Sequence, residues 1–149
     1  MRYLLADSII GVKAGEKIRG IKNIVMSEDF LEYHFPRNPV MPGMLLLEAL
    51  VQLTGWLEAA SSDFRNWFLL SKVRSSRFYG FSLPGDQVEL AVELSPRSEP
   101  DNRVYTGIAM VEGKKKASAE FEGETLPFEE IEDIDGQRRF FSLLTRDGI

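Results

Sequence analysis

The two side chains best suited to proton transfer are His34, the only histidine of the chain, and Glu48, which follows it by 14 residues. Three prolines between them exclude a regular helix or a central strand, so residues 35–42 are expected to form an ordered, irregular loop. Such a stiff loop would hold the imidazole of His34 in place. Glu48 lies inside a predicted helix with leucines on both sides, and partial burial there would favour the protonated form of its carboxyl. The pair therefore offers a base and an acid.

The start of this helix, near Gly43, offers a third group. Backbone N–H groups in the first turn have no partner within the helix and carry a partial positive charge. Because Gly43 has no side chain, a carbonyl oxygen can approach these amides and be polarised by them. With a base, an acid and an oxyanion site, and with no cofactor, the expected chemistry is removal of a proton beside a carbonyl and reversible elimination of water.

A structural explanation of the same residues stays open at this point. A lone histidine is commonly a surface or packing residue, and Glu48 can simply belong to a polar stripe along the helix. Helical spacings of three and four place these residues on one face: Glu48, Gln52, Gly55, Ala59 and Ser62.

The composition excludes several other classes of function. The chain has 149 residues, of which 44% are hydrophobic and 28% charged, as in an ordinary single-domain globular protein. A net charge of −5 argues against nucleic acid as the main partner, and the absence of cysteine excludes disulfides and thiolate chemistry. Residues 40–60 are apolar enough to raise the question of a membrane span, but two glutamates make a buried helix the better interpretation. The N-terminal residues lack a secretory signal pattern, so a cytoplasmic protein is expected.

Residue periodicity predicts strands on both sides of one long helix. The helix is predicted to begin at Pro42 and to end between residues 60 and 62, and its apolar residues cover almost its whole circumference. Strands are predicted at residues 3–12, 17–25, 67–73 (extended past a bend by 78–81), 87–94, 103–111 and 117–122. Residues 103–111 are apolar on both faces, which predicts a central place in the sheet.

These elements predict an α+β architecture in which an antiparallel sheet curls around one central helix. A helix that is apolar on all sides needs a wrapping sheet, and one layer still leaves the far side open, which favours a dimer. This domain is assigned to residues 1–125. Residues 126–149 form a C-terminal extension, for which the expected structure is a short amphipathic helix docked by Phe140, Phe141 and Leu144. An alternative role for the extension is a lid over a pocket or a contact with another subunit.

The segment HFPRNPVMPGMLLLEALVQ resembles the HFPxxPxxPGxLxxEAxxQ signature of the FabZ-type β-hydroxyacyl-acyl-carrier-protein dehydratases. The segments LPGDQVEL and VEGKKKASAEF resemble a strand turn and the last hairpin of the same family, so that the similarity covers residues 2–123. The signature residues kept in register are His34, Phe35, Pro36, Pro39, Pro42, Gly43, Leu45, Glu48, Ala49 and Gln52.

The resemblance implies a hot-dog fold that works as a dimer, with the histidine of one subunit facing the acid of the other. By likeness, His34 would handle the Cα proton of the substrate and Glu48 the departing hydroxyl. Gly43 would offer its amide to the thioester carbonyl, and Gln52 would orient the glutamate. Phe35 and Pro42 complete the implied substrate-binding residues. The related dehydratase-isomerases have aspartate at the acid position, so Glu48 favours plain dehydration.

The resemblance also implies partners. The expected substrate is an acyl carrier protein with a phosphopantetheine-linked acyl chain, and the expected assembly is a homodimer, alone or as a trimer of dimers. Because carrier proteins are acidic, Arg74 and Arg77 are candidate contacts, although ordinary solvated charges would look the same. The rival functions are another hot-dog enzyme, either a thioesterase or an enoyl-coenzyme A hydratase, and a non-catalytic acyl-binding subunit.

Two departures from the family pattern lie beside the candidate site. Tyr33 and Arg37 stand where family members usually have glycine, which leaves the substrate range open. Arg37 could serve the phosphate of phosphopantetheine or the carrier protein. The family's N-terminal helix is also expected to be missing, because MRYLLADSI aligns with the start of its first strand.

Overall fold

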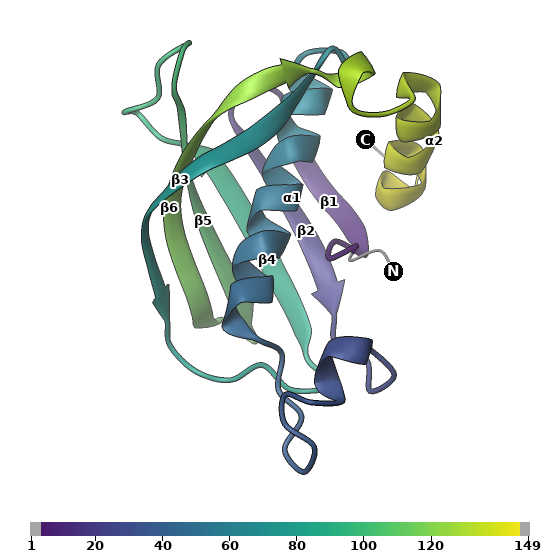
Figure 1. The fold of residues 1–149 in the computed structure, drawn as a ribbon, viewed down its shortest axis with the longest axis vertical. Helices are drawn as coiled ribbons and strands as arrows, with labels where there is room; N and C mark the ends of the chain where they lie inside the picture. The colour runs from purple at the N-terminus through teal and green to yellow at the C-terminus, as the bar shows by residue number, and fades with distance from the viewer. Residues whose placement is uncertain (1–3, 147–149) are drawn as a thin grey trace.

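The computed structural model describes residues 4–146 as one antiparallel sheet wrapped around one long helix (Figure 1). The six strands lie in the order β1-β2-β4-β5-β6-β3, and the helix, α1, lies against the concave face of the sheet. This is the hot-dog arrangement expected from the sequence. The strands are β1 (Ser8–Lys13), β2 (Lys17–Asn23), β3 (Asn66–Phe78), β4 (Gln87–Leu94), β5 (Arg103–Val111) and β6 (Lys114–Pro127).

Helix α1 (Gly43–Ser61) confirms the predicted central helix, with Pro42 immediately before its first residue. Its leucines pack against the inner face of the sheet, and Leu50 and Leu53 are fully buried. Burial of a leucine side chain contributes about 1.5–3 kcal/mol, so this interface stabilises the fold. Within residues 4–146, no helix combines the length and the apolar character that crossing a bilayer requires.

The sheet follows the predicted alternation, with differences in β1, β3 and β6: residues 4–7 of the strand predicted at 3–12 are not strand, and β6 extends beyond the predicted 117–122 at both ends. Strand β5 lies between β4 and β6, which confirms its central place. The strand predicted at 67–73, with its extension past a bend at 78–81, is β3, which includes residues 74–77, ends at Phe78 and pairs with β6 along its whole length. Two irregularities, at Leu70/Lys72 and Val73/Ser75, supply the bend. Tyr3, the first residue of the strand predicted at 3–12, lies outside the described residues.

The two edges of the sheet are finished differently. Strand β1 is short, has an irregular register between Ile9 and Gly11, and is covered by helix α2 (Ile134–Thr145). Strand β3 is long and is paired on one side only. Unpaired edges of this kind are sites where a second chain can add to a sheet.

Helix α2 lies in the segment after β6, which also contains one short 3-10 helix, η2 (Phe128–Glu130). Another 3-10 helix, η1 (Asp29–Leu31), precedes the loop that carries His34. Asp133 accepts a hydrogen bond from the Gly136 N–H at 3.0 Å and caps the start of α2. Phe140 and Phe141 each lie 5.7 Å from the Trp56 ring of α1, measured between centroids. The division of the chain at residues 125 and 126 stays a prediction, and β6 continues to Pro127.

Candidate active site

The loop that carries His34 is closed by its own hydrogen bonds. Phe35 and Asn38 exchange two backbone hydrogen bonds of 3.0 and 3.1 Å, and the Val40 N–H donates to the His34 carbonyl at 2.8 Å. The Met41 N–H then donates to the Ser82 carbonyl at 2.9 Å, which ties the end of the loop to the segment after β3. Figure 1 shows the result as a narrow loop below the start of α1. The stiffness expected from the prolines is therefore supported by specific contacts.

The same loop determines which nitrogen of His34 carries a proton. Nδ1 of His34 lies 2.9 Å from the carbonyl oxygen of Val40, and the ring stacks on Phe35 with centroids 4.5 Å apart. A carbonyl oxygen only accepts hydrogen bonds, so Nδ1 must be the donor. In the neutral imidazole this leaves Nε2 with a free electron pair. His34 is thus held as a base, with Nε2 as the atom that can take a proton.

Glu48 is exposed, so the predicted partial burial is wrong for the single chain. The leucines beside it, Leu46 and Leu47, turn inward, whereas position 48 points away from the sheet. Gln52 lies one turn further along α1 and is partly buried. Its Nε2 donates to Glu48 Oε1 at 3.1 Å, and its Oε1 accepts from the Leu5 N–H at 3.0 Å. Gln52 therefore fixes one carboxylate oxygen of Glu48.

The polar stripe considered from the sequence does not continue past Gln52. Gly55 and Ala59 are buried, and the ring of Trp67 lies over Gly55. The face of α1 that carries Glu48 is thus open near the start of the helix and closed near its end.

The first amides of α1 are available, but the space beside Gly43 is not empty. The N–H groups of Leu45 and Leu46 bond to the Pro42 carbonyl, whereas the N–H groups of Gly43 and Met44 have no acceptor within residues 4–146. A Cβ at Gly43 would lie 2.7 Å from the Phe78 ring, so Phe78 occupies the side that the missing side chain leaves free. The glycine therefore permits close packing of Phe78 beside an amide that has no acceptor within residues 4–146.

No hydrogen bond joins His34 to Glu48 in the described part of the chain. Large apolar side chains around both residues face solvent, including Met44 at 64% and Phe81 at 69% exposure. A hollow of about 710 Å³ lies beside the His34 loop and is lined by Phe35, Pro39, Val40 and Phe81, among others. Exposed apolar surface of this extent marks an interaction site.

The two candidate arginines differ in their surroundings. Arg74 donates to Glu122 at 2.6 Å and to Glu120 at 3.3 Å, and these contacts raise its pKa. Arg77 is exposed and has no ion pair among residues 4–146. The charge of Arg74 is therefore offset by two acids, while that of Arg77 is free to attract an anion. Arg37 is also exposed, in the His34 loop.

Within the described chain, no three acidic or histidine side chains are grouped as a metal site would require.

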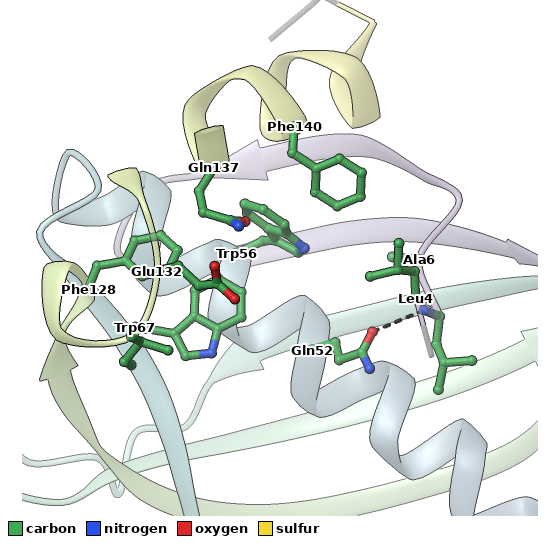
Figure 2. Close-up of a pocket in the computed structure, with 11 residues that line it drawn as sticks. Leu4, Ala6, Gln52, Trp56, Trp67, Phe128, Glu132, Gln137 and Phe140 are labelled. Carbon is green, nitrogen blue, oxygen red and sulfur yellow. Dashed lines mark hydrogen bonds between the residues drawn. The ribbon is translucent and has the colours of Figure 1, made fainter. Parts of the chain in front are cut away.

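The C-terminal extension borders a pocket, which the sequence raised only as an alternative and did not locate. A cavity of about 190 Å³ lies beyond Gln52 along α1 and is bounded by Trp56, Trp67 and the C-terminal extension (Figure 2). The sequence signal for it is Gly55 in the middle of a helix, next to Trp56, because an interior glycine marks a close approach of another group.

Comparison with known proteins agrees with this geometry. Residues 1–120 match the family model described as the FabA-like domain. The 3-hydroxyacyl-[acyl-carrier-protein] dehydratase FabZ of Shewanella pealeana is 37% identical over 124 residues, which cover 79% of this chain and 79% of that protein. The enzyme of the same name from Nitratidesulfovibrio vulgaris is 41% identical over 120 residues, covering 78% of this chain and 77% of that protein.

Solved structures show the same fold at low sequence identity. The protein smu.793 of Streptococcus mutans, bound to acetyl CoA, superposes with a TM-score of 0.66 at 13% identity over 85% of this chain and 94% of that one. The dehydratase heterocomplex ApeI:P of Xenorhabdus doucetiae gives a TM-score of 0.61 at 14% identity over 77% of this chain and 95% of that one. With the sheet, the signature loop and the matched relatives taken together, the chain belongs to the FabA-like family.

Proposed function

We propose that this protein is a dehydratase of fatty-acid or related lipid biosynthesis, which removes water from β-hydroxyacyl thioesters on acyl carrier protein to give trans-2-enoyl thioesters. The observation that carries the proposal is the geometry of the signature: His34 held with Nε2 free, Glu48 held by Gln52, and two open amides at the start of α1. The relatives at 37–41% identity are named for the same reaction. A carrier-protein substrate also favours a cytoplasmic location.

The reaction can be written in terms of these groups. Nε2 of His34 takes the Cα proton, and the electron pair of that C–H bond forms the Cα–Cβ double bond. The Cβ–O bond breaks as the carboxyl of Glu48 gives its proton to the hydroxyl, which leaves as water. The Gly43 amide hydrogen-bonds the thioester oxygen and stabilises the charge that develops there. His34 and Glu48 are the catalytic residues of the proposal.

The proposed active unit is a homodimer in which each site takes His34 from one subunit and Glu48 from the other. Three observations support it: no hydrogen bond joins the two side chains among residues 4–146, the surface around them is apolar and exposed, and β3 presents an unpaired edge. A second copy would cover that surface and would also bury Glu48, which favours the protonated form required of the acid. Three such dimers could assemble further.

The experiment that separates the candidate reactions is an assay of the purified protein with a crotonyl thioester, followed by ultraviolet absorbance. The proposal predicts reversible hydration, seen as loss of the absorbance of the conjugated enoyl thioester with no release of thiol. Release of free thiol would instead identify a thioesterase. Saturable binding without turnover would identify a non-catalytic acyl-binding protein. Faster turnover on coenzyme A than on carrier-protein thioesters would favour the hydratase.

Arg77, with Arg74 beside it, is the proposed contact for the acidic carrier protein. Arg77→Glu should weaken carrier-protein binding about ten-fold at low salt and less at high salt, because long-range attraction is screened by ions. Lys114→Glu, at the first residue of β6, is the control and should change binding little. A loss of binding that does not depend on salt would remove Arg77 from this role. Adding Arg74→Glu should increase the effect only modestly, because Arg74 is already paired with acids.

A further inference from the structure

The C-terminal extension builds a wall of the cavity that begins one turn beyond the candidate acid. The family model ends at residue 120, so η2 and α2 lie outside the matched region. Both fold back onto the core, where α2 packs on β1 and Phe140 packs on Trp56. The extension is thus a distinct addition to the helix-and-sheet core, placed next to α1 (Figure 1).

The cavity has one aromatic wall, one mixed wall and a floor formed by α1, and the exposed Glu132 also lines it (Figure 2). On one side Trp67 stacks on Phe128, with ring centroids 5.0 Å apart, and meets Trp56 edge-on at 5.2 Å. On the other side lie Phe140 and Gln137 of α2. An aromatic wall of this kind offers a large apolar contact area to a ligand.

Gln52 connects the cavity to the candidate catalytic residues. It lines the cavity and also donates its hydrogen bond to Glu48, four residues earlier on α1. Four residues correspond to about 6 Å along a helix axis. An acyl chain whose reacting carbons lie at Glu48 therefore needs to extend only one turn along α1 to reach the cavity.

The size and the polar groups of the cavity limit what it can hold. Its volume, about 190 Å³, is below the range of about 300–1,000 Å³ that is typical for a whole ligand, so it suits only the end of a chain. Gln137 lies in the wall formed by α2, and burying further methylenes against its amide would leave that amide without water.

We infer that the C-terminal extension sets an upper limit on acyl-chain length, with the terminal methylenes of a short β-hydroxyacyl chain held between Trp56, Trp67 and Phe140. This inference rests on the proposed function, because it concerns the substrate of the same site. It makes Phe140 and Gln137 determinants of specificity that the reaction itself does not require.

The test compares Phe140→Ala with Leu143→Ala in the full-length protein. Phe140 borders the cavity, whereas Leu143, on the same helix, is 71% exposed. The hydration rate is measured for trans-2-enoyl thioesters of increasing even chain length, from crotonyl upward. Phe140→Ala should raise kcat/KM on longer chains relative to crotonyl, by about four-fold for each additional methylene that finds room, because burying one CH₂ contributes about 0.8 kcal/mol. Leu143→Ala should keep the wild-type order of preference.

A second variant, Gln137→Leu, keeps the inference testable if Phe140→Ala fails to fold. Gln137→Leu keeps the side chain similar in size and removes its polar group, so it should also raise activity on the longer chains. Thermal unfolding of each variant shows whether the comparison is made on folded protein. An unchanged order of preference in folded Phe140→Ala and Gln137→Leu would overturn the inference, even with full activity on crotonyl thioester. Absence of crotonyl hydration in the wild type would instead contradict the proposed function.

Discussion

The two ends of helix α1 lie in opposite environments. At its start, Gly43 and Glu48 border an open, apolar surface, and two backbone amides have no acceptor in the described chain. Near its end, Gly55 is buried beneath the ring of Trp67. Glu58 is only 3% exposed and is held by Arg103 through two hydrogen bonds of 3.1 and 3.2 Å. The last turns of α1 are therefore packed and hydrogen-bonded, whereas its first turn is open and has backbone amides without acceptors in the described chain.

This difference shows how a stable core can display reactive groups. Exposed apolar side chains and unpaired amides do not stabilise an isolated chain, whereas the aromatic cluster and the buried ion pair hold α1 in place. The open end is the end that needs a substrate and a second subunit to complete it. Variants at the two ends should accordingly separate activity from stability.

The largest expected effect is on activity, at the open end. His34→Ala and Glu48→Gln should each lower kcat/KM for enoyl thioester hydration by about 10²–10⁴-fold, because each removes one positioned proton-transfer group. The melting temperature should change little, since neither side chain is buried in the chain. Glu32→Gln, at an exposed glutamate near the same loop, is the control for loss of one acidic charge. A loss of less than about ten-fold in both variants would remove the pair from the chemistry.

The next largest effect is on stability and compares Gly55 with Gly43, the two glycines of α1, each of which packs against an aromatic ring. In Gly55→Ala, the new Cβ would lie 2.1 Å from the Trp67 ring, which packs against both Trp56 and Phe128, so relief of the clash would disturb this aromatic cluster. Denaturant unfolding should show a loss of about 1–3 kcal/mol, as is typical of overpacking.

Gly43→Ala provides the matched variant at the open end. Its Cβ would lie 2.7 Å from the Phe78 ring, but Phe78 is 44% exposed and can swing into solvent. The cost in unfolding free energy should therefore be well below that of Gly55→Ala, and alanine's higher helix propensity offsets part of it. Equal losses in the two variants would contradict the proposed difference between the ends.

The smallest expected effect is on the pH dependence of stability, through Glu122 of β6, which lies outside α1. Hydrogen bonds from Asn102 and then from Arg74 lower the pKa of Glu122 below its ordinary value of 4.5. The unfolded chain therefore binds a proton before the folded chain does, so this contribution to stability is present above pH 4.5 and is lost as the pH falls through the lowered pKa. Glu122→Gln should flatten the acid side of the stability curve, measured by denaturation from neutral pH to about pH 3. Glu124→Gln, on the same strand, is the control, and an unchanged curve in Glu122→Gln would contradict this coupling.

Much of the fold could be predicted because its signals are local. The apolar pattern around the whole helix predicted α1, and the alternation of apolar residues predicted β4 and β5 with the boundaries that the structure shows. Residues 74–77 of β3 were left out of the predicted strand because, from Ser71 onward, most residues of β3 face solvent, so that no alternation of apolar residues marks it. Its continuity comes from backbone pairing with β6, which is a long-range effect.

The candidate site was predictable in its residues and less so in its surroundings. The signature identified His34, Glu48 and Gln52, and the structure adds the bonds that hold them. The exposure of Glu48 could not be deduced, because leucines on either side of it in the sequence point in another direction on the helix. The cavity depends on the docking of α2 against Trp56, a contact between distant parts of the chain that periodicity does not reveal.

In the proposed enzyme, each active site combines His34 of one subunit with Glu48 of the other. The direct test is to unfold and refold together equal amounts of the two inactive variants, His34→Ala and Glu48→Gln, and to assay enoyl thioester hydration. A mixed dimer then has one site with both residues intact, so random pairing should restore about a quarter of the wild-type activity. A mixture as inactive as either variant alone, with mixed dimers shown to have formed, would contradict a site shared between subunits.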